Sequence, residues 1–270
     1  MSSLPIGELD AICYQYHAPA SQTGRTFVFF NAIAGDLNAW EGQVAPALRK
    51  AGHGTLSWNF RGQADSPAAP DIELDTDLIV EDTGRLLAAV QPPHPVFVGL
   101  SIGGLYAAHY WLRSAGAEGL VLVNMLRRPG ARIQWLNEAV VRALEVGGLQ
   151  LLKDLYGFGL FNEEFLAEQR ANFFPDAPYQ PMPRDHGIYR LLSAARGADW
   201  EVPYQDLTLP VLVVTGREDR LFLDPDDVDQ LYRRLPTAQR VDLSNAAHMI
   251  PVERPEELTR HLLKFAGELP

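Results

Sequence analysis

Residues 95–104 read PVFVGLSIGG and are followed by LYAAHYWL, so a serine stands between an apolar run and a helical pattern. An apolar run, a glycine-rich turn and a helical pattern are the order that a strand, a tight turn and a helix require. Glycines at 99, 103 and 104 suit such a turn, because a Cβ there would collide with neighbouring backbone. The stretch predicts that Ser101 is presented above the end of a strand, beside the N-terminus of a helix.

The rest of the chain alternates short β-branched or aromatic runs with longer helical patterns. This alternation indicates an α/β fold with a mostly parallel central sheet and helices on both faces. Several runs are apolar at consecutive positions, as expected for strands that are covered on both faces. The expected strands are AICYQYH (11–17), TFVFFN (26–31), GTLSWNF (54–60), PVFVGL (95–100), GLVLVNM (119–125), PVLVVTG (210–216) and AQRVDLS (238–244).

The alternation is interrupted once, between residues 126 and 206, where helical patterns occur without a parallel-strand run. We interpret 126–206 as a helical cap (lid) inserted into an α/β core that residues 1–125 and 207–270 form. The segment is rich in aromatic side chains, most of which are expected to pack it onto the core. Some are expected to line an apolar pocket, for which the candidates are Trp135, Phe158 and Phe161, together with Asn31 of the core.

Composition narrows the class of protein. Hydrophobic residues make up 47% of the chain and charged residues 21%, and no apolar run approaches the ~20 residues of a membrane span. The net charge of −11 argues against nucleic acid or an anionic membrane as a partner. Cys13 is the only cysteine, which excludes an internal disulfide and a multi-cysteine metal site. The first residues lack the features of an export signal, so we expect a cytoplasmic protein.

Ser101 needs partners, because a serine hydroxyl is a poor nucleophile near neutral pH unless a base and an orienting acid assist it. His248 is the best placed of seven histidines, in a loop between the last expected strand and the last helical pattern. Asp219 follows the run VLVVTG at the carboxyl end of a strand, where α/β sheets place their sites. The adjacent Glu218 is an alternative acid. The order Ser, Asp, His is the one expected after a strand–turn–helix nucleophile.

Five motifs, in order along nearly the whole chain, resemble the α/β-hydrolase fold with a helical cap. GLSIGG is further similar to the corresponding motif of β-ketoadipate enol-lactone hydrolases and related capped esterases. The resemblance implies acyl transfer by Ser101, His248 and Asp219, with no metal and no organic cofactor. The motifs are FVFFNAIAGDLNAW (27–40), NFRGQADSP (59–67), GLSIGGLYAAHYW (99–111), VTGREDRLF (214–222) and NAAHMIPVERPEEL (245–258).

The resemblance also implies an oxyanion hole, which falls on the backbone N–H groups of Ile33 and Ile102. Where the family usually has His-Gly, this chain has Asn31 and Ala32. The Asn31 side chain could supply a further donor to the oxyanion or satisfy local backbone groups, and both roles stay open at this point.

The sequence thus predicts a serine hydrolase that cleaves a small or medium apolar carboxylic ester or lactone through an acyl-enzyme on Ser101. Two alternatives keep the fold. One is a C–C bond hydrolase or a cofactor-free dioxygenase, which the altered Asn31-Ala32 segment leaves open. The other is a non-catalytic ligand-binding receptor, although such a protein would not need Ser101, Asp219 and His248 together.

Overall fold

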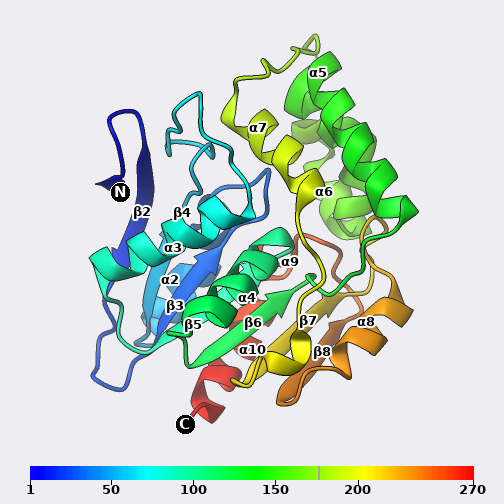
Figure 1. Cartoon of the computed structure of the whole chain (residues 1–270). Coiled ribbons are helices and arrows are strands. Elements are labelled where there is room, and N and C mark those ends of the chain that lie inside the picture. The colour runs from blue at the N-terminus through cyan, green and yellow to red at the C-terminus, as the bar shows by residue number, and fades with distance from the viewer. Residues whose placement is uncertain (176) are drawn as a thin grey trace.

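The computed structural model describes residues 1–175 and 177–270, which are built around an eight-stranded sheet (Figure 1). The strand order is β1-β2-β4-β3-β5-β6-β7-β8; the pairs β1–β2 and β2–β4 are antiparallel and all others are parallel. The mostly parallel sheet predicted from the sequence is therefore confirmed. The strands are β1 (Ser2–Pro5), β2 (Ala11–His17), β3 (Thr26–Phe30), β4 (Gly54–Trp58), β5 (Pro95–Leu100), β6 (Gly119–Val123), β7 (Val211–Gly216) and β8 (Ala238–Leu243).

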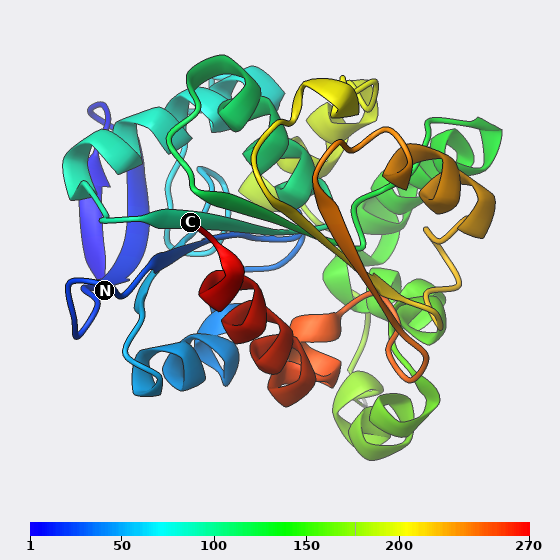
Figure 2. The ribbon, with the colours of Figure 1, turned by 90° about the horizontal axis from the view of Figure 1, so that it is seen from below.

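Helices cover both faces of the sheet, which Figure 2 shows from below. Each face buries its own apolar cluster, so the central parallel strands are apolar on both sides. One helix layer contains α3 (Thr76–Val90), α4 (Ile102–Ser114) and α8 (Pro225–Tyr232); the other contains α1 (Asn38–Glu41), α2 (Val44–Lys50), α9 (Ile250–Glu253) and α10 (Pro255–Glu268). The apolar cluster between the sheet and the first of these layers includes Trp58, Phe60 and Tyr106, and the cluster beneath the second includes Phe29, Trp40 and Phe265.

The sequence does not predict β1, the edge strand at the N-terminus. Its residues, SSLP, lack a β-branched or aromatic run, and only pairing with β2, in which Ser3 lies opposite Cys13, makes them a strand. The tertiary partner overrides the weak local preference.

Between β6 and β7 the described residues form helices and no strand. These helices stand beyond the carboxyl ends of the central strands (Figure 1). Three backbone hydrogen bonds tie the segment to the core loops there. The amide of Arg220 donates to the carbonyl oxygen of Gly159 at 3.0 Å, and the amides of His248 and Met249 donate to that of Leu160 at 3.0 and 3.3 Å. The elements are α5 (Ala131–Leu160), α6 (Glu163–Phe173), α7 (Gly187–Ala194), η1 (Ala195–Gly197) and η2 (Tyr204–Asp206).

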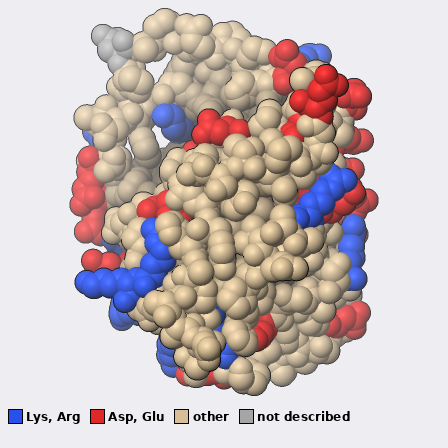
Figure 3. Space-filling model, turned by 90° about the vertical axis from the view of Figure 1, so that its left-hand side faces the viewer, with Lys and Arg blue, Asp and Glu red and all other residues tan. Residues whose placement is uncertain are grey.

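Surface charges of both signs are interspersed with wide neutral areas on the face that Figure 3 shows. Within residues 1–175 and 177–270, no helix combines the length and the apolar character needed to cross a membrane.

Candidate active site

Ser101 stands at the turn between β5 and α4 in a backbone conformation that non-glycine residues rarely adopt, with φ 56° and ψ −124°. The chain can turn this sharply because Gly103 lets α4 approach the end of β3. A Cβ on Gly103 would lie 2.4 Å from the carbonyl oxygen of Phe30 and 2.5 Å from that of Asn31. The strained turn holds the Ser101 side chain at the carboxyl edge of the sheet, as the sequence predicts.

Asp219 and His248 are in direct contact at the same edge. Nδ1 of His248 lies 2.6 Å from Oδ2 of Asp219, and the two residues are 3% and 5% exposed. The other carboxylate oxygen, Oδ1, accepts from the backbone amides of Leu221 at 3.0 Å and Phe222 at 2.9 Å. The structure thus brings Asp219 to the imidazole, whereas the alternative acid Glu218 is only partly buried.

The surroundings of Asp219 keep it ionised. Burial by itself raises the pKa of a carboxyl group, but His248, the Phe222 amide and the charge of Arg127 all act in the other direction. The result is a pKa of Asp219 below its ordinary value. A carboxylate at this position can hold the imidazole in one tautomer and stabilise the imidazolium.

Glu253 holds the loop that carries His248, and the sequence analysis did not single it out. One of its oxygens accepts from the amides of Asn162 at 2.8 Å and Ala247 at 3.0 Å, and the other from the amide of Met249 at 2.9 Å. Both chain neighbours of His248 are thus fixed by one buried carboxylate, which also reaches the segment between β6 and β7. Glu253 lies within VERPEE, and nothing in that pattern marks which of its acidic residues turns inward.

Asn124 is a second positioning residue that the sequence analysis missed. It directly follows β6 with a positive φ of 49°, and its Nδ2 donates to the carbonyl oxygens of Ala247 and His248, both at 2.9 Å. Its Oδ1 accepts from the Gly216 amide at 2.8 Å, at the end of β7. An asparagine directly after a buried apolar run is a signal that could have found it, because asparagine tolerates the left-handed region.

Arg127, also missed, contacts the candidate nucleophile itself. Its Nη2 donates to Oγ of Ser101 at 2.6 Å. Within the described chain, no hydrogen bond joins Ser101 to His248, and the two are linked through neighbours: Arg127 stacks on Phe222, which lies against the His248 ring with centroids 4.7 Å apart. The sequence reads LRRPG here, and the two adjacent arginines give no sign of which one is buried.

Asn31 satisfies local groups, which is one of the two roles that the sequence left open. Its Nδ2 donates to the carbonyl oxygen of Trp58 at 2.8 Å and to Oε1 of Gln63 at 3.0 Å, and its Oδ1 accepts from Nε1 of Trp40 at 3.0 Å. With these partners in place and the residue 1% exposed, the side chain is not free to donate to an oxyanion or to line a pocket.

The backbone N–H groups of Ile33 and Ile102 make no hydrogen bond to any residue that the structure describes. They lie on neighbouring turns, since Gly103, next to Ile102, packs against the carbonyl of Asn31. Gln63 fixes the first of these turns, because its Nε2 donates to the carbonyl oxygens of Ala32 at 2.9 Å and Ile33 at 3.0 Å. Two unpaired amides on fixed turns are suited to stabilising a developing negative charge.

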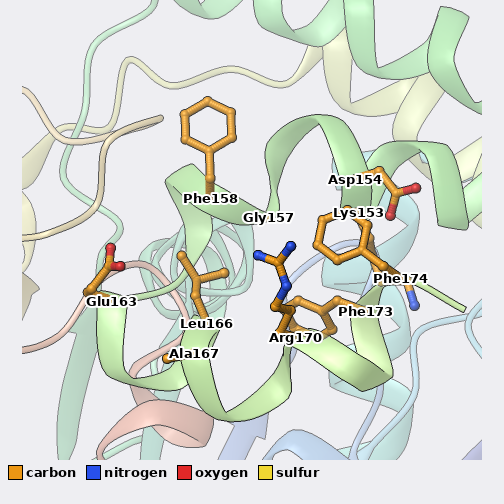
Figure 4. A pocket seen from close by; sticks show the side chains of 10 residues that line it. All are labelled: Lys153, Asp154, Gly157, Phe158, Glu163, Leu166, Ala167, Arg170, Phe173 and Phe174. Atoms are coloured by element: carbon orange, nitrogen blue, oxygen red, sulfur yellow. The ribbon is translucent and has the colours of Figure 1, made fainter.

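No hydrogen bond joins the aromatic pocket candidates to Ser101 within the described part of the chain. Trp135 is 81% exposed and lies along an outer groove of α5. Phe158 is 58% exposed and lines a groove between α5 and α6, which Figure 4 shows with Arg170 at its centre. Phe161 stacks on Phe165 with ring centroids 4.8 Å apart. Helical spacing shows that Trp135 and Phe158 lie on a long helix but does not show which side of it faces solvent, and their role in a substrate pocket stays a prediction.

Known proteins share this architecture. The family model of the alpha/beta hydrolase fold matches residues 25–255. A protein of Variovorax paradoxus, provisionally named a carbamate hydrolase, is 27% identical over 211 residues, which cover 77% of this chain and 78% of that protein. A pimeloyl-[acyl-carrier protein] methyl ester esterase of Vibrio vulnificus is 28% identical over 204 residues, covering 70% and 76%. The crystal structure of the enol-lactonase of Burkholderia xenovorans LB400 has the same fold, with a TM-score of 0.79 at 22% identity over 98% of this chain and 100% of that one.

Proposed function

Because the chain belongs to the α/β-hydrolase fold family, we propose that it is a serine hydrolase that forms an acyl-enzyme on Ser101. Its substrate in this proposal is a small or medium carboxylic ester or lactone with an apolar carbon skeleton. The observation that carries the proposal is the 2.6 Å contact between His248 and Asp219, two buried residues at the sheet edge where Ser101 stands on a strained turn. The relatives named as a methyl ester esterase and an enol-lactonase support the choice of substrate class.

In the proposed mechanism, Asp219 keeps the proton of the imidazole on Nδ1. Nε2 of His248 then accepts the proton of Ser101 as Oγ attacks the carbonyl carbon. The backbone amides of Ile33 and Ile102 receive the oxyanion. His248 next protonates the leaving alcohol and activates the water that releases the acid.

The helical segment 126–206 acts as a cap in this proposal. Arg127 and Trp200 both belong to this segment: Arg127 contacts Oγ of Ser101 in the core, and Trp200 stacks on Arg127. The segment therefore closes over the reacting groups and limits the access of water to the acyl-enzyme.

A panel of chromogenic esters with increasing acyl length tests the function. We expect turnover by the wild-type protein with a burst of alcohol equal to one equivalent per site if deacylation is slower than acylation. Ser101→Ala should reduce turnover to near background, whereas Ser3→Ala, a change on the edge strand far along the sheet from β5, should not. Full turnover by Ser101→Ala would contradict the proposal.

A further inference from the structure

Arg127 is a buried cation with no carboxylate partner among the described residues. The residue is 5% exposed, and its hydrogen-bond acceptors are Oγ of Ser101 at 2.6 Å and, more weakly, the carbonyl oxygen of Asn124 at 3.5 Å. Its Nε is fully enclosed and has no acceptor within the described chain. A charged group that is buried without a charged partner destabilises the folded protein, which indicates that a bound anion supplies the partner.

Two aromatic rings hold the guanidinium in place. Its carbon atom lies 4.3 Å from the ring centroid of Trp200, in the segment between β6 and β7, and 4.5 Å from that of Phe222, in the loop after β7. Stacking fixes the guanidinium and directs Nη2 to Ser101. A planar guanidinium held in this way matches the geometry of a carboxylate, which it can bind through two parallel hydrogen bonds.

No carboxylate of the site is free to fill this role. The charge of Asp219 acts on Arg127, but both carboxylate oxygens of Asp219 already have partners. One contacts His248, and the other accepts from the amides of Leu221 and Phe222. Burial lowers the pKa of Arg127 to about 10, which still leaves it charged at neutral pH. The site therefore presents a desolvated positive charge next to the candidate nucleophile.

We propose that Arg127 binds a carboxylate group of the substrate, so that the natural ester or lactone carries this negative charge a few bonds from the scissile carbonyl. The inference rests on the proposed function, because it places the carboxylate relative to Ser101. When the substrate binds, its carboxylate replaces Oγ of Ser101 as the acceptor of Nη2, and Oγ becomes available to His248. Arg127 thus selects for an acidic acyl group within an otherwise apolar skeleton.

The test compares matched esters. Monomethyl succinate, glutarate and adipate are each paired with a neutral methyl ester in which an isopropyl group replaces the carboxylate, and kcat/KM is measured by alkali uptake at constant pH. We expect the wild type to prefer the anionic member of at least one pair by about 30-fold or more, the scale of charge-assisted hydrogen bonds. Arg127→Met, which keeps an apolar side chain between the two rings, should abolish this preference, mainly through KM.

Arg128→Met is the matched control, because Arg128 is adjacent in sequence but exposed. It should retain the wild-type preference. Arg127→Lys keeps the charge without the planar fork and should retain only part of it. Equal kcat/KM for both members of every pair in the wild type, or a preference that survives in Arg127→Met, would overturn the inference.

A binding measurement separates this inference from the proposed function. Succinate, glutarate or adipate should raise the thermal midpoint of the wild type and of Ser101→Ala but not that of Arg127→Met. If none of the three dicarboxylates shifts the wild type, the carboxylate site is contradicted even where esters are hydrolysed. If they shift it while no ester is turned over, the site stands and the proposed reaction fails.

Discussion

Nδ1 of His248 lies 2.6 Å from Oδ2 of Asp219, and β7 and β8 place the two residues in register from separate loops. The second carboxylate oxygen is held by the amides of Leu221 and Phe222, so the acid cannot rotate away from the imidazole. This relationship gives the imidazole one preferred tautomer and one orientation.

Replacing Asp219 with asparagine should lower kcat for a chromogenic ester by about a thousandfold or more, because an amide can donate to Nδ1 and so favour the wrong tautomer. Steady-state kinetics on the folded variant measure this. Glu218→Gln, one residue away and only partly buried, should remain within about twofold of wild type. A larger loss of kcat in Glu218→Gln than in Asp219→Asn would show that Glu218, and not Asp219, is the acid that orients His248.

Glu253→Gln should lower kcat with little change in KM. The carboxylate accepts three backbone N–H groups around His248, and glutamine offers one oxygen and an NH2 group that faces a donor. The free energy of unfolding should fall by about 1–3 kcal/mol, measured by urea denaturation. Glu256→Gln, an exposed change on α10, is the control and should alter neither quantity. A Glu253→Gln protein with wild-type kcat would show that this carboxylate does not position His248.

Gly103→Ala should disrupt the turn at Ser101, because the added Cβ would lie 2.4 Å from the carbonyl oxygen of Phe30. We expect a loss of about 1–3 kcal/mol in unfolding free energy together with a severe loss of ester turnover. Gly267→Ala is the matched control on α10, where the new Cβ would have no atom within 4 Å beyond its chain neighbours and the backbone of its own helix, and it should be neutral or stabilising by up to about 1 kcal/mol. Wild-type activity in Gly103→Ala would mean that α4 and β3 need not approach so closely.

The preference for anionic esters should depend on pH. Burial lowers the pKa of Arg127 to about 10, so the guanidinium loses its charge as the pH rises through that value. The ratio of kcat/KM for a monomethyl ester to that of its neutral partner reports the free enzyme and should be constant near neutral pH, then fall above pH ~10. A ratio that instead falls between pH 6 and about 8 would indicate that a histidine carries the selectivity.

The sequence predicted the parts of the molecule that depend on local pattern. Apolar runs gave the parallel strands, and the glycines around Ser101 gave the turn. The order of Ser101, Asp219 and His248 also agrees with the placement of Asp219 against His248 at one sheet edge. These features follow from strand ends and turns, which short stretches of sequence specify.

What the sequence did not predict depends on partners that are distant along the chain. Asn31 is occupied by Trp40 of α1 and by Trp58 and Gln63, and these last two meet it only when β3 and β4 pair. The sequence does not show which of Arg127 and Arg128 is buried, because burial of Arg127 depends on its contacts with the distant residues Trp200 and Phe222. Periodicity shows that a residue lies on a helix face but not what that face meets, as the exposed Trp135 illustrates.

The central claim is that Ser101 is the nucleophile, and covalent labelling tests it most directly. A fluorophosphonate probe reacts with a serine hydroxyl that a neighbouring base activates. Intact mass measurement should show one adduct on the wild type, located at Ser101 by peptide mapping, and no adduct on Ser101→Ala. An adduct at another residue, or an ester-hydrolysing wild-type protein that takes up no probe, would contradict the account.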